Sequence, residues 1–372
     1  MIRLFFLIRS LDPGGAERQL IELVKGLDKK LFSITVATFY DGGALRLEVD
    51  KLEGIRIISL KKKGRWDALP FFFRLLRDTR KMKPDIIHGY MGIANELSLL
   101  LGKILHAKVV WGARSSNVDF SRYDWAARWS FKIGAYLSSF PDLIIVNSWA
   151  GQKHHIAHGY SGKNMVVIPN GIDIEYFKPF VEERERVRTE WSVEKKTKLI
   201  GLIARLDPMK DHKNFLHAAA LLIQKRQDVK FVCVGDGPPL YKHELMALSE
   251  SLNLGNRLIC AGTRRDMPAV YNALDIATLC SYGEGFPNVI GEAMACGVPC
   301  VVTDAGDSAR IVSETGVVVS PRDPTALFHG FESCLARLED PDIHQKCRQR
   351  IVQEFSQSRM VNSTTRALES LL

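Results

Sequence analysis

The chain of 372 residues has no apolar run of about 18 residues or more, so we expect no segment that spans a membrane. Its apolar start, residues 1–9, leads into Asp12-Pro13-Gly14-Gly15 and not into a small-residue cleavage site. We interpret this start as a first strand and not as a secretion signal. The length is sufficient for two domains with separate cores.

Cysteine is missing from the first half of the chain. All seven cysteines lie in the second half, form no Cys-x-x-Cys pair and mostly fall in apolar runs. This pattern predicts buried thiols in a reducing compartment, and we therefore expect a cytoplasmic protein.

Two further motifs are absent. Val234-Gly235-Asp236-Gly237-Pro238 lacks the third glycine of a dinucleotide fingerprint, which disfavours a dehydrogenase. There is also no convincing Asp-x-Asp loop and no His/Cys ligand spacing. We therefore expect neither a metal nor a resident cofactor.

Acidic residues are scarce in the first half. Residues 1–176 carry 26 Lys and Arg against 17 Asp and Glu, whereas residues 177–372 carry 25 of each. The whole positive excess therefore belongs to the first half, and part of it is concentrated in residues 61–83.

The stretch 61–83 mixes basic and aromatic residues at helical spacing, including Lys61-Lys62-Lys63 and Phe71-Phe72-Phe73. Such a helix is typical of peripheral contact with an anionic bilayer. A core-facing helix with a solvated basic side explains the pattern equally well. No nucleic-acid motif accompanies the charge, so we expect no nucleic-acid partner.

Apolar runs bounded by turn residues alternate with helical patterns along the whole chain. Expected strands are Ile2–Ile8, Ile34–Phe39, Ile55–Ser59, Asp85–His88, Lys108–Trp111, Leu143–Val146, Val166–Ile168, Leu199–Ile203, Lys230–Val234, Arg257–Cys260, Ile276–Cys280, Pro299–Thr303 and Val317–Val319. Expected helices include Ala16–Leu27, Asn95–Leu105, Asn214–Gln224 and Leu240–Ser251. This order predicts doubly wound α/β architecture with parallel sheets.

The pattern restarts after the turn cluster Pro169-Asn170-Gly171-Ile172-Asp173, where we place the domain boundary. We expect a first Rossmann-like domain over residues 1–170 and a second over residues 171–355. The final helix, within residues 356–372, has no following strand in its own domain.

The most informative segment is residues 281–295, Ser-Tyr-Gly-Glu-Gly-Phe-Pro-Asn-Val-Ile-Gly-Glu-Ala-Met-Ala. Pro287 suits the first turn of a helix, and Gly297 followed by Pro299 indicates the end of that helix. The free N–H groups of a helix start attract an anionic or hydroxyl-rich ligand. Glu284 precedes this start, and Glu292 follows one turn after Asn288 on the same face.

This segment resembles the signature of the retaining glycosyltransferases of family 4. The resemblance implies the GT-B fold, in which two such domains face a cleft and the final helix crosses back to the first domain. It also implies that Glu284 meets hydroxyls of the donor sugar and that Glu292 meets the ribose. The turn from Phe286 to Val289 would offer backbone N–H groups to the sugar and the phosphate. The resemblance thus implies donor contacts by Gly285, Phe286, Pro287, Asn288 and Val289.

Arg205 and Lys210 follow an expected strand and match the cations with which this family grips the donor diphosphate. A cation about 4 Å from a phosphate in a partly shielded site is worth roughly 4 kcal/mol before desolvation. Two such cations can replace a metal. The alternative is an ordinary surface loop, and we expect Lys213 to be solvated.

Two other loops match the family. Gly14 and Gly15 open the first helix, where a backbone without side chains lets a ligand approach closely, and a plain turn is the alternative. Thr263 and Arg264 fall in residues 260–267, which resemble the family's loop whose backbone meets the base of the donor nucleotide. Asp266 in that run is expected to cap the next helix.

Family members often carry a histidine in a first-domain loop, and the corresponding run here, residues 109–117, has Arg114 instead. An arginine stabilises a departing phosphate but cannot act as a base. His88 is the other expected contributor, with a structural histidine at a strand end as the alternative. His154, His155 and His158 are expected to lie on the surface.

These features predict a retaining glycosyltransferase that moves a sugar from a nucleotide-sugar, expected to be a UDP-sugar, to a glycan acceptor. We expect a lipid-linked intermediate of bacterial capsule, exopolysaccharide or O-antigen assembly as acceptor, met at the inner face of the membrane. A nucleotide-sugar epimerase of the same fold and a non-catalytic subunit of glycan assembly are the alternatives.

Overall fold

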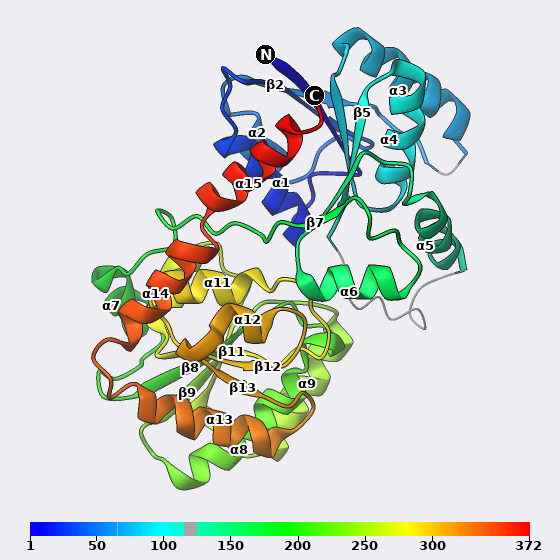
Figure 1. Cartoon of the computed structure of the whole chain (residues 1–372). Coiled ribbons are helices and arrows are strands. Elements are labelled where there is room, and N and C mark those ends of the chain that lie inside the picture. Colours follow the sequence, from blue (N-terminus) through cyan, green and yellow to red (C-terminus); the bar gives the residue numbers. More distant parts are fainter. Residues whose placement is uncertain (65, 115–124) are drawn as a thin grey trace. The chain divides into compact units, whose positions relative to one another are not determined.

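The computed structural model describes residues 1–64, 66–114 and 125–372. Arg65 and Ser115–Asn117, which belong to two of the motifs above, lie outside the described residues. The described chain forms two compact units, residues 1–171 with 357–372 and residues 172–356. Each unit contains one parallel sheet, so the predicted doubly wound α/β class is confirmed (Figure 1).

The first unit holds a seven-stranded sheet. Its strands, in spatial order, are β3 (Ile55–Ser59), β2 (Phe32–Thr38), β1 (Ile2–Ile8), β4 (Ile86–Tyr90), β5 (Lys108–Ala113), β6 (Leu143–Val146) and β7 (Met165–Val167). Its helices are α1 (Gly15–Gly26), α2 (Arg46–Val49), α3 (Ala68–Met82), α4 (Gly92–Leu105), α5 (Trp125–Leu137), α6 (Trp149–Ala157) and α15 (Gln357–Glu369). The strand order reverses between β1 and β4, whose carboxyl ends therefore mark a binding edge.

Strand β1 is buried on both faces, which explains its unbroken apolar sequence. Leu4 and Phe6 pack with helices α1 and α15, whereas Phe5 and Leu7 pack with helices α3 and α4. Side chains alternate between the faces of a strand, so one heptapeptide supplies both cores.

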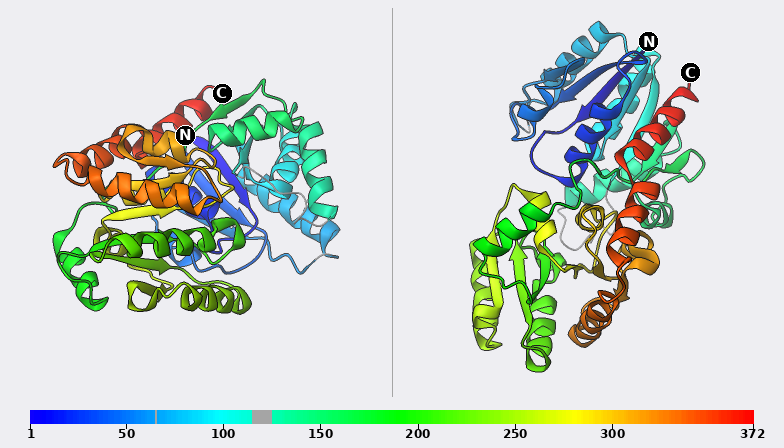
Figure 2. Two further views of the ribbon diagram at one scale, coloured as in Figure 1. Left: turned by 90° about the horizontal axis from the view of Figure 1, so that it is seen from below. Right: turned by 90° about the vertical axis from the view of Figure 1, so that its left-hand side faces the viewer.

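Helix α15, red in Figures 1 and 2, belongs to the first unit, which confirms the expectation that the final helix returns there. Its Val361 contacts α1 so closely that a Cβ on Gly26 would lie 2.5 Å from a Val361 methyl group. Gln357 at its start donates hydrogen bonds to the backbone oxygen and the carboxylate of Glu22.

The second unit holds a six-stranded sheet. Its strands, in spatial order, are β10 (Leu258–Gly262), β9 (Val229–Val234), β8 (Lys198–Ile203), β11 (Ile276–Leu279), β12 (Cys300–Thr303) and β13 (Val317–Val319). Its α-helices are α7 (Val181–Glu190), α8 (His212–Lys225), α9 (Pro239–Ser251), α10 (Met267–Ala273), α11 (Asn288–Ala295), α12 (Ser308–Val312), α13 (Pro324–Arg337) and α14 (Ile343–Glu354). Short 3-10 turns include η2 (Pro208–Lys210), η3 (Gly255–Arg257) and η4 (Ser313–Thr315).

Two expectations about individual residues are wrong. His155 is buried and its ring packs 4.8 Å from that of Tyr160, because the aromatic side of α6 faces α5 and the core. Cys260 is exposed, because it lies on the edge strand β10, although five of the seven cysteines are buried as expected.

A buried ion pair anchors α7 to the sheet of the second unit. The side chain of Arg188 is nearly inaccessible and donates to Asp275 at 3.0 Å and to the carbonyl oxygen of Ala273 at 3.0 Å. Asp275 also accepts hydrogen bonds from Arg184 at 2.8 Å and from the backbone of Leu199 at 2.7 Å. The carboxylate therefore joins α7 to the first strand of its unit.

We predict that Asp275→Ala lowers the free energy of unfolding of the second unit by about 3–5 kcal/mol, because it leaves a buried guanidinium without its carboxylate. The control is Asp228→Ala, whose partner Arg226 is solvent-exposed, with an expected loss of about 0–1 kcal/mol. Urea unfolding measures both. Equal losses would contradict the anchoring role.

Candidate functional site

The site is built from two neighbouring strand ends. Strands β8 and β11 pair in parallel, so their carboxyl ends point to the same edge of the sheet. The backbone N–H of Tyr282, after β11, donates to the carbonyl oxygen of Met209, in η2, at 3.2 Å. This bond ties together the two segments that carry the predicted cations and the first predicted glutamate.

Lys210 and Glu284 meet at this junction. Their ammonium and carboxylate groups are 2.5 Å apart, and 21% and 11% of the two side chains are exposed. An ion pair so shielded from water interacts more strongly than a surface pair. An ammonium group carries three N–H donors, so Lys210 has the capacity to hold an anion while it contacts Glu284.

The turn that carries Glu284 is held by a second loop. The backbone of Asp307 donates to the carbonyl oxygen of Gly285 at 2.9 Å. Gly306 has a positive φ of 61°, and a Cβ there would lie 2.5 Å from the carbonyl oxygens of both Glu284 and Gly285. Only glycine fits at this position, and sequence reasoning missed it because the contact joins residues about twenty positions apart.

Helix α11 begins directly after this turn, at Asn288, with Pro287 at the N-cap and no side chain that caps it. Its first N–H groups therefore point toward the turn that carries Glu284. The side chain of Phe286 is buried against Phe355, with ring centroids 5.4 Å apart. Phe286 can therefore offer a ligand its backbone and not its side chain.

Glu292 lies one turn into α11. Its carboxylate accepts a hydrogen bond of 2.6 Å from the hydroxyl of Tyr271 on α10. Burial raises the pKa of Tyr271 well above its usual range, and the neighbouring Glu292 adds to this effect. Tyr271 thus stays protonated and fixes one carboxylate oxygen. Sequence reasoning missed this positioning residue, for which no motif exists.

The contacts of Arg205 do not bring it to the Lys210–Glu284 pair. Its side chain is 70% exposed and donates to Asp207 at 2.8 Å. Asp207 also accepts from the backbone of Met209 and so caps η2. Arg205 therefore stands at the same strand end as a solvated cation held by a carboxylate, with rotamer freedom to approach a ligand.

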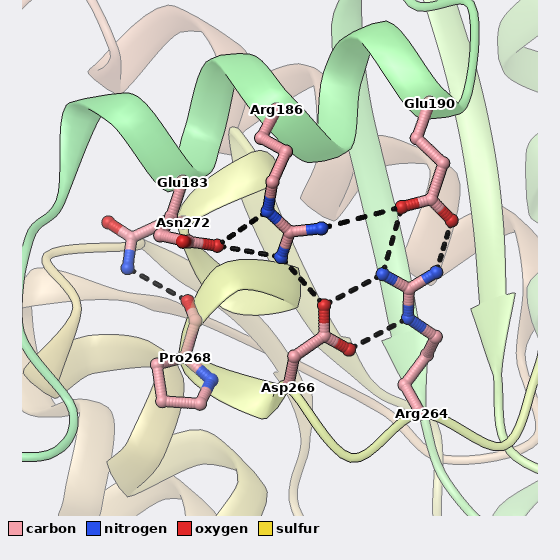
Figure 3. A network of polar contacts seen from close by, with 7 residues as sticks. All are labelled: Glu183, Arg186, Glu190, Arg264, Asp266, Pro268 and Asn272. Carbon is pink, nitrogen blue, oxygen red and sulfur yellow. Dashed lines mark hydrogen bonds and ion pairs between the residues drawn. The ribbon is translucent and has the colours of Figure 1, made fainter.

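Arg264 is held in a network of ion pairs at the surface of the second unit (Figure 3). Its guanidinium contacts the carboxylates of Glu190 and Asp266, and Arg186 donates to Asp266 at 2.8 Å. The hydrogen bonds from Arg264 hold the pKa of Asp266 well below its usual range. Asp266 stands at the N-cap of α10 but makes no capping bond, so its predicted capping role is wrong.

The rest of the segment 260–267, which the resemblance assigns to the base of the nucleotide, lies at the end of β10. Thr263 is exposed, and the carbonyl oxygen of Gly262 accepts from the backbone of Gly235 at 2.8 Å. Beside these two glycines is a mainly apolar cavity of about 550 Å³, bounded also by His212, Leu245 and Cys260. A flat apolar group that enters at the strand ends would find buried surface there.

In the first unit, Gly14 is the N-cap of α1 and Gly15 its first residue. The carboxylate of Glu17 folds back over this start, so that a Cβ on Gly14 would lie 2.2 Å from its oxygen. Burial raises the pKa of Glu17, and nearby Asp12 raises it further. The structure thus places an acidic side chain where the glycines leave the backbone open.

His88 and Arg114 both lie near Tyr90 in the first unit. His88 is fully buried on β4, and burial lowers its pKa well below the usual range, as does Arg114. Arg114 donates to the hydroxyl of Tyr90 at 2.9 Å and to the side chain of Asn170 at 3.1 Å. The arginine therefore connects the end of β5 to residues just before the second unit.

Two features are absent from the described residues. No group of three or more His, Cys, Asp or Glu side chains there is arranged to hold a metal ion. No helix there combines the length and the apolar character needed to cross a bilayer.

Comparison with known families gives matches over both units. Residues 13–176 match the family model "Glycosyltransferase Family 4", and residues 197–337 match "Glycosyl transferases group 1". A D-inositol 3-phosphate glycosyltransferase of Corynebacterium urealyticum is 31% identical over 344 residues, which cover 85% of this chain and 81% of the relative.

A UDP-Gal:alpha-D-GlcNAc-diphosphoundecaprenol alpha-1,3-galactosyltransferase of Escherichia coli is 30% identical over 198 residues, about half of each chain. Among solved structures, Anabaena Alr3699/HepE in complex with UDP has a TM-score of 0.88 at 24% identity, over 99% of this chain and 100% of that one. The same Anabaena protein has also been solved with UDP-glucose. The likeness shows a shared fold.

The site also predicts acid sensitivity through His212, the first residue of α8. Burial, together with the neighbouring charge of Lys210, lowers its pKa from 6.5 to about 4. Between about pH 4 and pH 6.5, the unfolded chain therefore binds a proton at His212 that the folded chain does not bind. The stability that His212 contributes is full above pH 6.5 and is lost as the pH falls toward 4.

We predict that wild-type stability falls by about 2 kcal/mol more than that of His212→Gln between pH 7 and pH 5, at about 1.4 kcal/mol per pH unit within the window. Urea unfolding at both pH values measures this difference. Parallel pH dependence in the two proteins would show that His212 is not held in its neutral form.

Proposed function

The chain belongs to glycosyltransferase family 4, and on that premise we propose that it transfers a sugar from a UDP-sugar to a glycan acceptor with retention of anomeric configuration. The single observation that carries this proposal is the shielded Lys210–Glu284 pair at the start of α11. It combines a cation, a carboxylate and a helix N-terminus without a side-chain cap, which are the groups that recognise a sugar diphosphate.

The proposed donor roles combine this geometry with those that the family resemblance implies. Lys210 and the first N–H groups of α11 face the diphosphate, and Arg205 approaches it from the neighbouring loop. Glu284 accepts hydrogen bonds from hydroxyls of the sugar, and Glu292 accepts them from the ribose. The base is directed to residues 260–267, beside the cavity at the ends of β9 and β10. Arg264 contributes through its backbone, since its side chain is engaged by two carboxylates.

The choice of UDP is supported by relatives. The name of the Escherichia coli relative specifies a UDP-Gal donor, and the Anabaena protein has been solved with UDP and UDP-glucose.

Transfer with retention requires little from a side-chain base. The bond between the anomeric carbon and the diphosphate oxygen breaks as the acceptor oxygen bonds to the same face of that carbon. The acceptor proton passes to an oxygen of the leaving diphosphate. Lys210 and the α11 N–H groups stabilise the charge on that leaving group, and we assign Arg114 a supporting role. No resident metal or cofactor is proposed.

His88 is assigned a positioning role. Its pKa lies well below neutrality, so at pH 7 the ring carries no charge that would bind a phosphate. It packs 4.9 Å from the ring of Tyr90, which receives the hydrogen bond of Arg114. His88 therefore acts on the reaction through the placement of Tyr90 and Arg114.

The proposed acceptor is a lipid-linked intermediate of bacterial cell-surface polysaccharide, met at the inner face of the membrane. The residues 61–83 support this, because α3 exposes Leu69 and Phe73 beside its basic residues. Phe71, by contrast, is buried in the core between α3 and the sheet. Trp66, 93% exposed, extends the apolar surface before the helix.

We predict that Lys210→Ala lowers kcat/KM for transfer about 100-fold or more, because it removes the cation that stabilises the leaving diphosphate. The matched control is Lys213→Ala three residues further on, whose exposed side chain pairs with Glu244 and should tolerate the change. Steady-state transfer to a soluble acceptor measures both. Similar losses in the two variants, or none in Lys210→Ala, would refute the assigned role.

We predict that Leu69→Ser with Phe73→Ser lowers transfer to a lipid-linked acceptor in vesicles and leaves transfer to a soluble analogue unchanged. The two apolar side chains are exposed, so their loss removes membrane contact and not core packing. Equal activity of variant and wild type on the vesicle-bound acceptor would contradict a role of α3 in reaching the membrane.

A further inference from the structure

Helix α5 in the first unit carries an exposed apolar stripe on its outer face. The exposed fractions are 60% for Trp129, 47% for Ile133, 78% for Tyr136 and 51% for Phe140, which follows the helix. Trp129, Ile133 and Tyr136 are spaced by four and three positions, so they lie in one line along the helix, and Phe140 follows four positions later. A solvated helix normally places charged and polar residues on such a face.

The core of the unit does not explain this stripe. The opposite face of α5 makes the inner contacts, where the ring of Phe131 lies 5.1 Å from that of Tyr160. A Cβ on Gly134 would lie 2.5 Å from the hydroxyl of Tyr160, so that face is closely packed. Helix α5 therefore has two apolar faces, of which one serves the fold and the other faces outward.

The outer stripe continues onto helix α4. Leu100 and Ile104, one turn apart, are 45% and 37% exposed. Lys103, between them in the sequence, places its ammonium group 4.7 Å from the centroid of the Phe140 ring, which joins the two helices at their surface. Helices α3, α4 and α5 lie on the same side of the sheet, at the right of the first unit in Figure 1.

The charge on this side is basic. By sequence, α3, α4 and α5 carry seven Lys and Arg against two acidic residues, and α5 contains no acidic residue. Lys132 lies over the ring of Trp129 at 5.7 Å. Trp, Tyr and Phe interleaved with Lys is the composition of helices that lie in a membrane interface.

This charge also argues against a second copy as the occupant. Pairing two such faces would bring basic residues together without acidic partners on the stripe. A nucleic acid would leave the apolar side chains uncovered. An anionic bilayer satisfies both features, since its headgroups meet the lysines and its acyl boundary receives the aromatic rings.

We propose that the outer faces of α4 and α5, the stripe of Leu100, Ile104, Trp129, Ile133, Tyr136 and Phe140, insert into the interface of an anionic membrane. This surface widens the contact proposed for α3 from one helix to three. It does not depend on catalysis, because membrane binding is measured without a nucleotide sugar.

The test is flotation of the full chain with vesicles of equimolar phosphatidylglycerol and phosphatidylcholine, compared with vesicles of phosphatidylcholine alone. Wild type should float with the anionic vesicles, and Trp129→Ser with Tyr136→Ser should lower the partition coefficient about tenfold or more. The matched control is Tyr176→Ser with Leu240→Ser, which removes exposed apolar residues from the second unit and should change nothing. Lys103→Glu with Lys132→Glu should remove the preference for anionic vesicles.

Circular dichroism and activity on a soluble acceptor show whether the variants fold. If a serine variant unfolds, the fallback experiment is quenching of tryptophan fluorescence by brominated lipids. The quenching in the wild type should then exceed the quenching in Trp129→Phe. Unchanged flotation of the folded serine variant overturns the proposal. So does a concentration-dependent dimer that the same substitutions abolish. Failure of transfer with intact flotation would refute the proposed function alone.

Discussion

The parallel pairing of β8 with β11 is the constraint on which the site depends. It directs the two strand ends to one edge of the sheet, so that η2 and the turn after β11 meet through a backbone hydrogen bond from Tyr282 to Met209. Lys210 and Glu284 belong to these two segments and are 74 positions apart in the sequence. The fold thus assembles the cation and the acid before a ligand arrives, which lowers the cost of ordering them on binding.

The remaining parts of the site are held around this junction by residues to which we assign no contact with the ligand. Gly306 lets a second loop support the turn of Glu284, and Tyr271 fixes one oxygen of Glu292 from a buried position. Both residues act by packing and hydrogen bonding on the two acids to which we assign contacts with the donor. A preorganised pair of carboxylates discriminates hydroxyl patterns better than a mobile pair, because its geometry is not adjusted to each ligand.

The sequence was sufficient to predict the fold class, most strands and the helix start after Glu284, because these rest on local periodicity and on turn chemistry. It was not sufficient where the burial of a side chain depends on how a helix is turned about its axis, or where the partner of a side chain is distant in the sequence. Three adjacent phenylalanines do not reveal which one faces the core, and the structure buries Phe71 while Phe73 is exposed. Likewise, no local pattern shows that Arg264 is engaged by Glu190, which lies 74 positions earlier.

The same limit explains the stripe on α5. Its apolar residues follow helical spacing, and spacing alone does not distinguish a face buried in the core from a face turned outward. Only the packing of Phe131 and Gly134 on the opposite side decides between them. Exposure, and not hydrophobicity, is therefore the observation that points to a membrane.

The most direct test of the account is a crystal structure of the protein soaked with a UDP-sugar. The account predicts the diphosphate against Lys210 and the first N–H groups of α11, with the sugar hydroxyls at Glu284 and the ribose at Glu292. A nucleotide bound away from the ends of β8 and β11, or no bound nucleotide at saturating concentration, would contradict it.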